Sequence, residues 1–323
     1  MRKRLLIFIL LGWVLLIIGD RVDELRVYQG AQIAMYTIAL SSIVLLTGYS
    51  GQVSLGNGAM MAVGGYAAAL TLNNLQTPIW FAFLMAILAS AVFGALLGAS
   101  AARLSGPYLA GTTLALAVGL PALANQFEFL GGEQGILFDV GFPPERFGEE
   151  FSQYKWFFWI ATFIALVSIF ITSNILHSRF GRTWRAIRGN SLAAELAGIH
   201  SARMKVLAFT ISSAIAGLAG AVLAMTISLV SPGAYTLSLS FALVTGAVLA
   251  GISSLPGVML GAVILVAIPE IADVVAHRLG DSEKVITHLP GLIVSVLLIL
   301  SVIFTPNGPG ENLRKHRHKK SAH

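Results

Sequence analysis

Apolar residues occur along this chain in long continuous runs that are separated by short polar stretches. About ten runs approach the length of ~20 residues that an α-helix needs to cross the hydrocarbon core of a bilayer. Because these runs are continuous rather than alternating at every second residue, they predict membrane-spanning helices and argue against an outer-membrane barrel. The predicted spans are 5–19, 31–47, 55–72, 79–101, 108–126, 154–176, 206–230, 237–253, 257–275 and 290–304.

Composition agrees with this pattern. The chain is 56% hydrophobic and only 11% charged, whereas about a quarter of the residues of a soluble domain are charged. Its mean hydropathy is +0.80. No low-complexity linker divides it, so we expect an all-α polytopic membrane protein with one transmembrane domain over 1–323.

Two boundaries are less well defined by the pattern. The first run follows Met1-Arg-Lys-Arg, which is typical of a signal peptide, but no small-x-small cleavage site follows it. We therefore expect the first helix to be retained. At 253–257 only four residues separate two apolar runs, and this pair could instead form one broken re-entrant unit.

The charges fall in alternate connections between the runs. Basic residues gather at the start of the chain, at Arg103, in the loop 177–205 and in the tail 306–323, while acids dominate the loop 127–153. Cytoplasmic loops of membrane proteins carry an excess of Lys and Arg. With about ten spans, all the basic connections fall on one side. We expect a cell-membrane protein with both termini in the cytoplasm and an extracytoplasmic loop at 127–153.

One predicted span carries an unusual number of glycines, in the stretch GYSGQVSLGNGAMMAVGGYAAA at 48–69. Each glycine costs a helix about 1 kcal/mol relative to alanine, and irregular backbone at membrane depth is tolerated only inside protein or along a wet cavity. A broken glycine-rich helix that lines a substrate path is one interpretation, and close helix packing is the other. Candidates for the translocation pathway are Gln52, Ser54 and Asn57, with Thr112 and Thr113 as weaker ones.

Other small residues are spaced four apart, which places them on one helix face and favours contact between helices. These pairs are Gly94 and Gly98, Ala216 and Gly220, and Gly257 and Gly261.

The basic loop contains the stretch GRTWRAIRGNSLAAELAGI at 181–199. Asn190 or Ser191 is a good N-cap, and Gly198 is a natural C-terminal stop. They predict a short helix that must pack on something, because two turns are unstable alone in water. The arginines before it are spaced so that they share one side of a helix, at Arg182, Arg185 and Arg188. These arginines either fix topology against lipid phosphates or flank a docking surface for a cytoplasmic protein; docking also explains the cap and the stop.

Several kinds of chemistry have no residues to support them. The chain has no cysteine, no G-x-x-x-x-G-K-[ST] nucleotide loop and no G-x-S-x-G nucleophile motif. Its histidines lack metal-binding spacing, and no single basic patch suggests nucleic acid. Between residues 31 and 253 no acid lies inside a predicted span, and the lysine there, Lys155, is at the very start of one, so a proton relay is absent there. Glu270 and Asp273 are better interpreted as interfacial. We expect no enzyme, no metal site and no cofactor bound by this chain.

Leu192-Ala-Ala-Glu-Leu-Ala-Gly198 resembles the E-A-A-x-x-x-G loop motif of ATP-binding-cassette (ABC) importer permeases, with Leu192 in place of the glutamate. The surrounding loop is similar to that of the LivM-type permeases of branched-chain amino acid importers. TGYSGQVSLGNGA at 47–59 and the block at 231–265 are similar to further motifs of that family. In the second block Ala250 and Gly251 stand where two glycines are usual, and Pro256-Gly257 inverts the usual Gly-Pro. The resemblance covers about residues 30–305.

The resemblance implies a membrane subunit of a binding-protein-dependent importer that works by alternating access. Its partners would be a second, related permease, two ABC ATPase subunits that use ATP, an extracytoplasmic substrate-binding protein and membrane lipid. The ATPase-coupling surface would contain Ala193, Ala194, Glu195 and Gly198, flanked by Arg182, Arg185 and Arg188. A permease for urea or short amides is a close alternative. A self-contained secondary transporter or channel is a more distant one.

Overall fold

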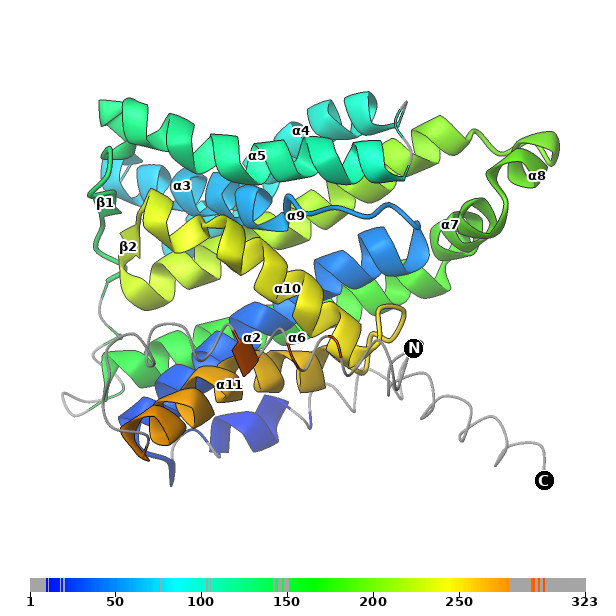
Figure 1. The fold of residues 1–323 in the computed structure, drawn as a ribbon. Coiled ribbons are helices and arrows are strands. Elements are labelled where there is room, and N and C mark those ends of the chain that lie inside the picture. The colour runs from blue at the N-terminus through cyan, green and yellow to red at the C-terminus, as the bar shows by residue number, and fades with distance from the viewer. Residues whose placement is uncertain are drawn as a thin grey trace, which may run out of the picture.

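The computed structural model describes residues 21–278 except 76, 103, 105, 142, 145, 146 and 148–150, together with 10, 12–17, 19, 292, 293, 296 and 299. Within these residues the chain is a bundle of helices with one two-stranded sheet (Figure 1). The main helices are α2 (Glu24–Ile43), α3 (Asn57–Leu75), α4 (Ile79–Ala101), α5 (Pro107–Gln126), α6 (Gln153–His177), α9 (Ser201–Ile227), α10 (Leu237–Ala250) and α11 (Val258–Arg278).

Shorter elements lie at the ends of these helices. A π-helix, η1 (Val44–Tyr49), continues α2, and α7 (Arg179–Gly189) and α8 (Ser191–Leu196) follow α6. The remaining elements are η2 (Glu128–Leu130), β1 (Ile136–Leu137), β2 (Leu229–Val230) and η4 (Pro232–Tyr235). Figure 1 shows α7 and α8 at one end of the bundle and the two strands at the other.

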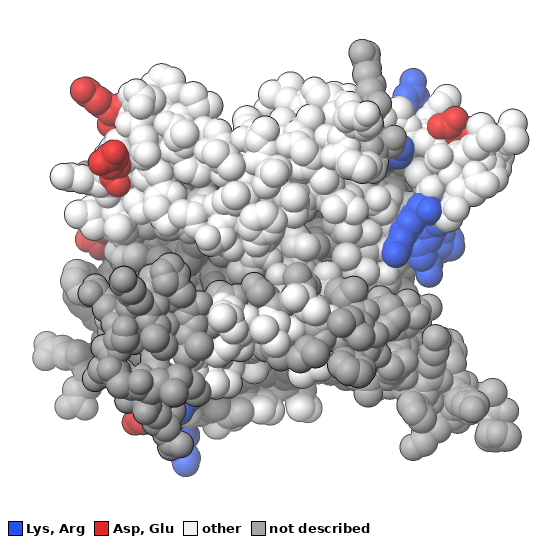
Figure 2. All heavy atoms as spheres, viewed as in Figure 1, with Lys and Arg blue, Asp and Glu red and all other residues white. Residues whose placement is uncertain are grey.

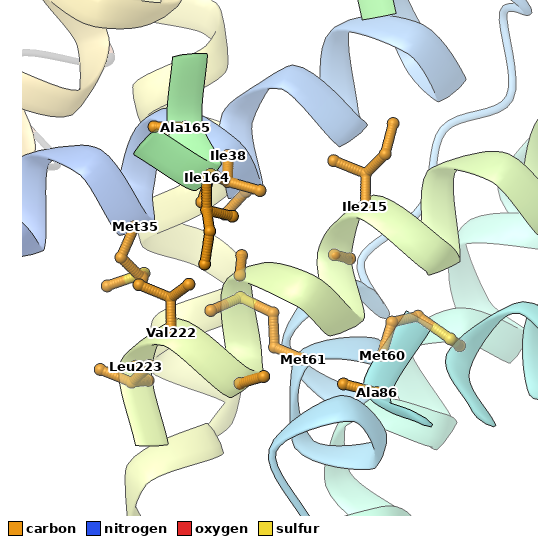
Figure 3. Close-up of a cluster of buried hydrophobic side chains, with 14 of the residues drawn as sticks. Met35, Ile38, Met60, Met61, Ala86, Ile164, Ala165, Ile215, Val222 and Leu223 are labelled. Atoms are coloured by element: carbon orange, nitrogen blue, oxygen red, sulfur yellow. The ribbon is translucent and has the colours of Figure 1, made fainter. Parts of the chain in front are cut away.

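Helix α9 lies at the centre of the bundle and packs against α2, α3 and α4. It is apolar on most of its circumference, which is typical of a helix buried within a larger bundle. Figure 3 shows Ile215, Val222 and Leu223 of α9 among apolar side chains from α2, α3, α4 and α6. By contrast, α4 and α5 lie at the periphery, with only 28% and 22% of their most apolar windows buried.

The helices around α9 approach it so closely that side chains are excluded at several contacts. A Cβ on Gly64 of α3 would overlap the backbone of Gly217, and one on Gly220 would overlap the backbone of Met61. The predicted contacts at Gly94 and Gly98 are confirmed, since a Cβ at these positions would meet Ser213 and Phe209 of α9. Small residues of this kind allow van der Waals contact between backbones, which stabilises helix pairs in lipid.

Six helices among the described residues are long and apolar enough to cross a membrane: Glu24–Tyr49, Ile79–Ala101, Pro107–Gln126, Gln153–His177, Ser201–Ile227 and Pro232–Ala250. The third and ninth predicted spans form α3 and α11 of the same bundle. About half of the first predicted span, most of the tenth, and the basic tail 306–323 lie outside the described residues. An all-α polytopic membrane protein is thus confirmed, whereas a total of about ten spans stays a prediction.

The connection at 251–257 separates α10 from α11, and the two helices pack against each other. Gly251 adopts a φ of +90° where α10 ends, a conformation that favours glycine. A Cβ on Gly261 would approach the carbonyl oxygen of Gly246, which confirms the predicted close contact on this helix.

Strand β1 attaches the loop 127–153 to the end of α9. It pairs antiparallel with β2, with Ile136 opposite Val230 and Leu137 opposite Leu229. Figure 2 shows most of the visible Lys and Arg at the end of the bundle that carries α7 and α8, and most of the visible Asp and Glu at the end that carries the strands. The two ends of the bundle therefore differ in charge as well as in structure.

Candidate coupling segment and translocation site

Helix α7 is held firmly against the bundle. Trp184 is fully buried, and its indole Nε1 donates a hydrogen bond to the carbonyl oxygen of Met204 at 2.8 Å. Ser178 caps the first turn by accepting a hydrogen bond from the backbone N–H of Phe180 at 3.2 Å. Gly181 lies so close to the carbonyl oxygen of Leu176 that no side chain would fit there. A movement of α7 therefore displaces the ends of α6 and α9 as well.

Helix α8 has the two ends that the sequence predicts. Asn190 separates it from α7, and its side-chain oxygen accepts a hydrogen bond from the N–H of Ala193 at 3.0 Å. At the other end Gly198 has a φ of +84°. The N–H of Ile199 donates to the carbonyl oxygen of Ala194 at 3.0 Å, and that of Gly198 donates to Glu195 at 2.9 Å. This pair of bonds is the Schellman arrangement that stops a helix at glycine.

The outer face of α8 is apolar. Leu192 and Leu196 are 67% and 85% exposed, and they are one turn apart, so they share a face of the helix. Ala193 and Glu195 are also exposed. Neighbouring exposed apolar side chains of this kind are typical of surfaces that contact a partner. Neither leucine was predicted from the sequence, although their spacing of four was the signal.

Ala194 does not belong to this face. It is only 5% exposed, because the helix turns this position toward the rest of the chain. The expectation that Ala194 contributes its side chain to a docking surface is therefore corrected, and its carbonyl oxygen serves the helix stop instead.

The three arginines of α7 that were predicted to share one side of a helix do not form one continuous surface. Arg182 donates to the carbonyl oxygen of His177 at 3.4 Å, and Arg185 lies over the ring of Tyr49 with its guanidinium carbon 5.6 Å from the ring centre. Arg188 instead reaches the bundle, where its Nη1 donates to the carbonyl oxygen of Gly48 and, at 2.9 Å, to the hydroxyl of Ser253.

The glycine-rich stretch contains an irregular segment at 50–56, between η1 and α3. Figure 1 shows this segment running back into the bundle, so that α3 begins away from the end that carries α7 and α8. Gly51 has a φ of +73°. The buried side chain of Gln52 donates to Ser50 Oγ at 2.7 Å and to the carbonyl oxygen of Lys205 at 3.1 Å. Its Oε1 atom is buried and has no hydrogen-bond partner among the described residues.

The other polar groups of this region are also enclosed by the chain. Ser54 and Asn57 are each 3% exposed. Asn57 donates to Ser42 Oγ of α2 at 3.1 Å, and Ser54 Oγ accepts from the N–H of Gly56 at 3.2 Å. In this conformation the three predicted pathway residues Gln52, Ser54 and Asn57 hold the irregular segment in place, which favours the packing interpretation for their side chains.

The two threonines of α5 differ from each other. Thr113 is buried, and its Oγ1 accepts a hydrogen bond from the N–H of Leu55 at 3.0 Å, which links α5 to the irregular segment. Thr112 lies on the exposed side of α5, and its hydroxyl donates to the carbonyl oxygen of Leu109 at 2.9 Å.

The exposed side of α5 carries small residues as well as large ones, whereas the exposed side of α4 is formed mainly by large residues. Residues four apart on α4 are large and exposed, which suits contact with lipid tails, at Leu84, Leu88, Val92 and Leu96. On α5, no atom of the described residues lies within 4 Å of where a Cβ on Gly111 or Gly119 would be, and Ala115 between them is exposed. Such small residues are typical of a helix face that meets another protein helix rather than lipid.

Glu270 of α11 lies within 3.4 Å of Arg26 at the start of α2, and both side chains are partly exposed, at 41% and 59%. A partly exposed ion pair with Arg26, in the first turn of α2, supports the interfacial interpretation of Glu270. The side chain of Asp273 lies outside the described residues.

The family described as "Branched-chain amino acid transport system / permease component" matches residues 28–302 of this chain. That match covers most of the sequence and nearly all of the described helices. The chain belongs to this family. The resemblance expected from the coupling segment and the glycine-rich stretch is therefore confirmed.

Relatives of this permease include proteins named LivM and proteins named LivH. The LivM permease protein of the high-affinity branched-chain amino acid transport system of Salmonella typhimurium is 30% identical over 85% of this chain and 67% of its own length. The Escherichia coli K12 LivM protein is 29% identical over the same shares. The LivH permease protein of Salmonella typhimurium is 26% identical over 84% of this chain and 90% of its own length. No solved structure matches.

Proposed function

We propose that this permease is a membrane subunit of a binding-protein-dependent ABC importer for branched-chain amino acids. The observation that carries the proposal is the exposed apolar face of α8, on a short helix with fixed ends, in a chain of the branched-chain amino acid permease family. A surface of this kind suits an ATPase that supplies energy, because the sequence has no nucleotide-binding loop of its own. The chain itself is then not an enzyme and binds no cofactor.

We infer that the end of the bundle with α7 and α8 faces the cytoplasm, because the basic residues gather there. The chain termini would lie on that side, and the strands with the loop 127–153 would lie outside, where a substrate-binding protein delivers the amino acid. Two ATPase subunits would act at the cytoplasmic face of the assembly, one of them on Leu192 and Leu196. Glu195, Arg182 and Arg185 would form the polar rim of that contact, and Ala193 would lie beside the leucines.

The second, related permease would pack on the exposed face of α5, where Gly111, Ala115 and Gly119 allow close approach. The presence of homologous permeases named LivM and LivH among the relatives supports two related permeases in one assembly. The translocation pathway would run along this face, with Thr112 facing it. Thr113, Gln52, Ser54 and Asn57 would hold the irregular segment that forms the wall behind it.

Cysteine labelling tests this position of the pathway, since the chain has no natural cysteine. We expect Thr112→Cys in the assembled transporter to react with a water-soluble maleimide in at least one nucleotide state, because a wet pathway allows the thiolate to form. Leu88→Cys on the lipid-facing side of α4 is the matched control and should stay unreactive. Protection of Thr112→Cys in every nucleotide state, or equal labelling of both variants, would contradict the proposed pathway.

Uptake in whole cells tests which class of substrate the transporter carries. Cells that lack this chain should lose most high-affinity uptake of labelled leucine, and the intact chain should restore it. Excess unlabelled valine and isoleucine should compete with leucine. A hydrophobic pocket discriminates between substrates that differ by one methylene by only about 10–200-fold, so related branched side chains should bind to the same site. Competition by urea or short amides, with no effect of the amino acids, would favour the alternative permease.

A further inference from the structure

Arg188 joins three segments that are far apart in the sequence. Its Nη1 contacts the carbonyl oxygen of Gly48, at the end of η1, and the hydroxyl of Ser253, in the connection between α10 and α11. Ser253 Oγ also donates to the carbonyl oxygen of Gly48 at 3.3 Å. The three groups thus form a closed triangle of hydrogen bonds, with one charged donor that has two neutral partners.

The apolar part of the Arg188 side chain is held as well. Its Cγ would lie 2.8 Å from a Cβ on Gly51, so the stem lies directly on the backbone of the irregular segment at 50–56. A Cβ on Gly48 would overlap the carbonyl oxygen of Ile252, so the end of η1, just before the irregular segment, is in direct contact with the connection between α10 and α11. The absence of a side chain at Gly51 therefore leaves the space that the arginine stem occupies, and its absence at Gly48 allows the connection 251–257 to approach.

Both segments that meet at Arg188 interrupt helices. The first separates η1 from α3, and the second, residues 251–257, separates α10 from α11. Arg188 itself lies two residues before Asn190, which ends α7 and caps α8. Because so few residues separate Arg188 from α8, a displacement of α8 should also move the guanidinium group of Arg188.

We propose that Arg188 is a positioning residue that clamps the two irregular segments together and moves them with α7 and α8. This inference rests on the proposed importer function, in which α8 contacts an ATPase. Closure of the ATPases displaces α8, the displacement reaches the Gly48 carbonyl and Ser253 through Arg188, and α3 and α11 shift together. Hydrogen bonds with a charged donor are about twice as strong as neutral ones, which suits a contact that transmits movement.

A simpler role for Arg188 would be to fix topology through its charge, as any basic residue of this loop does. Arg179 on the same helix illustrates that role. Its guanidinium carbon lies 5.0 Å from the ring centre of its neighbour Phe180, and the side chain is exposed. Arg179 carries the same charge as Arg188, but this ring contact is with the next residue of its own helix rather than with a distant segment. It is therefore the matched control.

The test compares Arg188→Met with Arg179→Met in the complete transporter reconstituted with its ATPases, second permease and binding protein. Methionine keeps an apolar stem over Gly51 but removes every donor. We expect Arg188→Met to keep ATPase co-purification and ATP hydrolysis while substrate imported per ATP hydrolysed falls about ten-fold, the factor that corresponds to loss of one charge-assisted hydrogen bond. Arg179→Met should leave that ratio unchanged.

A second variant measures whether Ser253 acts through Arg188. Ser253→Ala should lower the import ratio by a smaller factor, and the double variant should behave like Arg188→Met alone, because both changes break the same contact. If Arg188→Met fails to accumulate in membranes, the test rests on Ser253→Ala alone. A normal amount of substrate imported per ATP hydrolysed in that variant would overturn the proposal.

Two other results would overturn the clamp. Loss of ATPase binding in Arg188→Met would make Arg188 a docking residue, and an unchanged import ratio in both variants would leave it with a topological role. Failure of the proposed function is distinguishable from both, because the unaltered transporter would then show no ATP-driven import in the same assay.

Discussion

Replacing Leu196 by arginine is expected to abolish stable binding of the ATPase subunits and, with it, uptake. Leu196 is 85% exposed at the end of α8, so the change leaves the packing of this chain intact. In the assembled transporter the same position would be buried against an apolar surface of the ATPase. Changing a buried anchor of an interface costs about 2 kcal/mol or more, which corresponds to roughly thirty-fold weaker binding, and an unpaired guanidinium adds to that loss.

The measurement is a pull-down of the ATPase subunits from solubilised membranes, beside an uptake assay with labelled leucine. Leu137→Arg is the matched control, because Leu137 is 76% exposed in β1 at the opposite end of the bundle. That variant should keep full ATPase binding. Normal ATPase binding and uptake by Leu196→Arg would show that the leucine face of α8 has no role in docking.

The substitution Gly198→Val tests whether the defined end of α8 is needed for ATPase binding. Gly198 has a φ of +84° and open space around its Cβ position, so the strain comes from the backbone rather than from a clash. A left-handed conformation costs a residue with a Cβ about 1–2 kcal/mol, and more for a β-branched one. The helix end would shift and redirect the leucine face, so ATPase binding should weaken while the amount of chain in the membrane stays normal.

A bulky residue at Ala194 does not give the same information. From the sequence, the two adjacent alanines of α8 form a flat contact surface, and Ala194→Trp would then clash with the ATPase. The structure buries Ala194 within its own chain, so tryptophan there disturbs α8 itself. Loss of ATPase binding in that variant would not separate a damaged helix from a blocked surface.

Local features of the fold were predictable from the sequence because they depend on neighbouring residues. The cap at Asn190 and the stop at Gly198 follow from the backbone preferences of these residue types. Gly94 and Gly98 were recognised as a packing face because residues four apart share one side of a helix. Each of these features was identified from a stretch of fewer than about ten residues, without knowledge of the tertiary fold.

Features that depend on distant contacts were not predictable in this way. Arg188 contacts Gly48 and Ser253, which are 140 and 65 residues away along the chain, and no periodicity within the loop indicates those partners. The burial of Gln52 and Asn57 likewise depends on where α2 and α9 lie. Their polarity indicated an unusual segment, but the same polarity suits a pathway lining and a buried hydrogen-bond network equally.

The exposed face of α5 shows how the two kinds of information combine. The sequence supplies the small residues Gly111, Ala115 and Gly119, and the structure shows that none of the described helices covers them. With only 22% of its most apolar window buried, α5 has a large surface available for a partner helix. We therefore expect a single chain to be incomplete as a transporter.

Reconstitution in liposomes tests the central claim most directly. The purified chain alone should neither hydrolyse ATP nor accumulate leucine, because it has no nucleotide-binding loop and no partner for α5 or α8. Adding the second permease, the ATPases and the binding protein should give accumulation of leucine that depends on ATP. Accumulation of leucine by the single chain, driven by an ion gradient in the absence of ATP and partners, would contradict the assignment as an importer subunit.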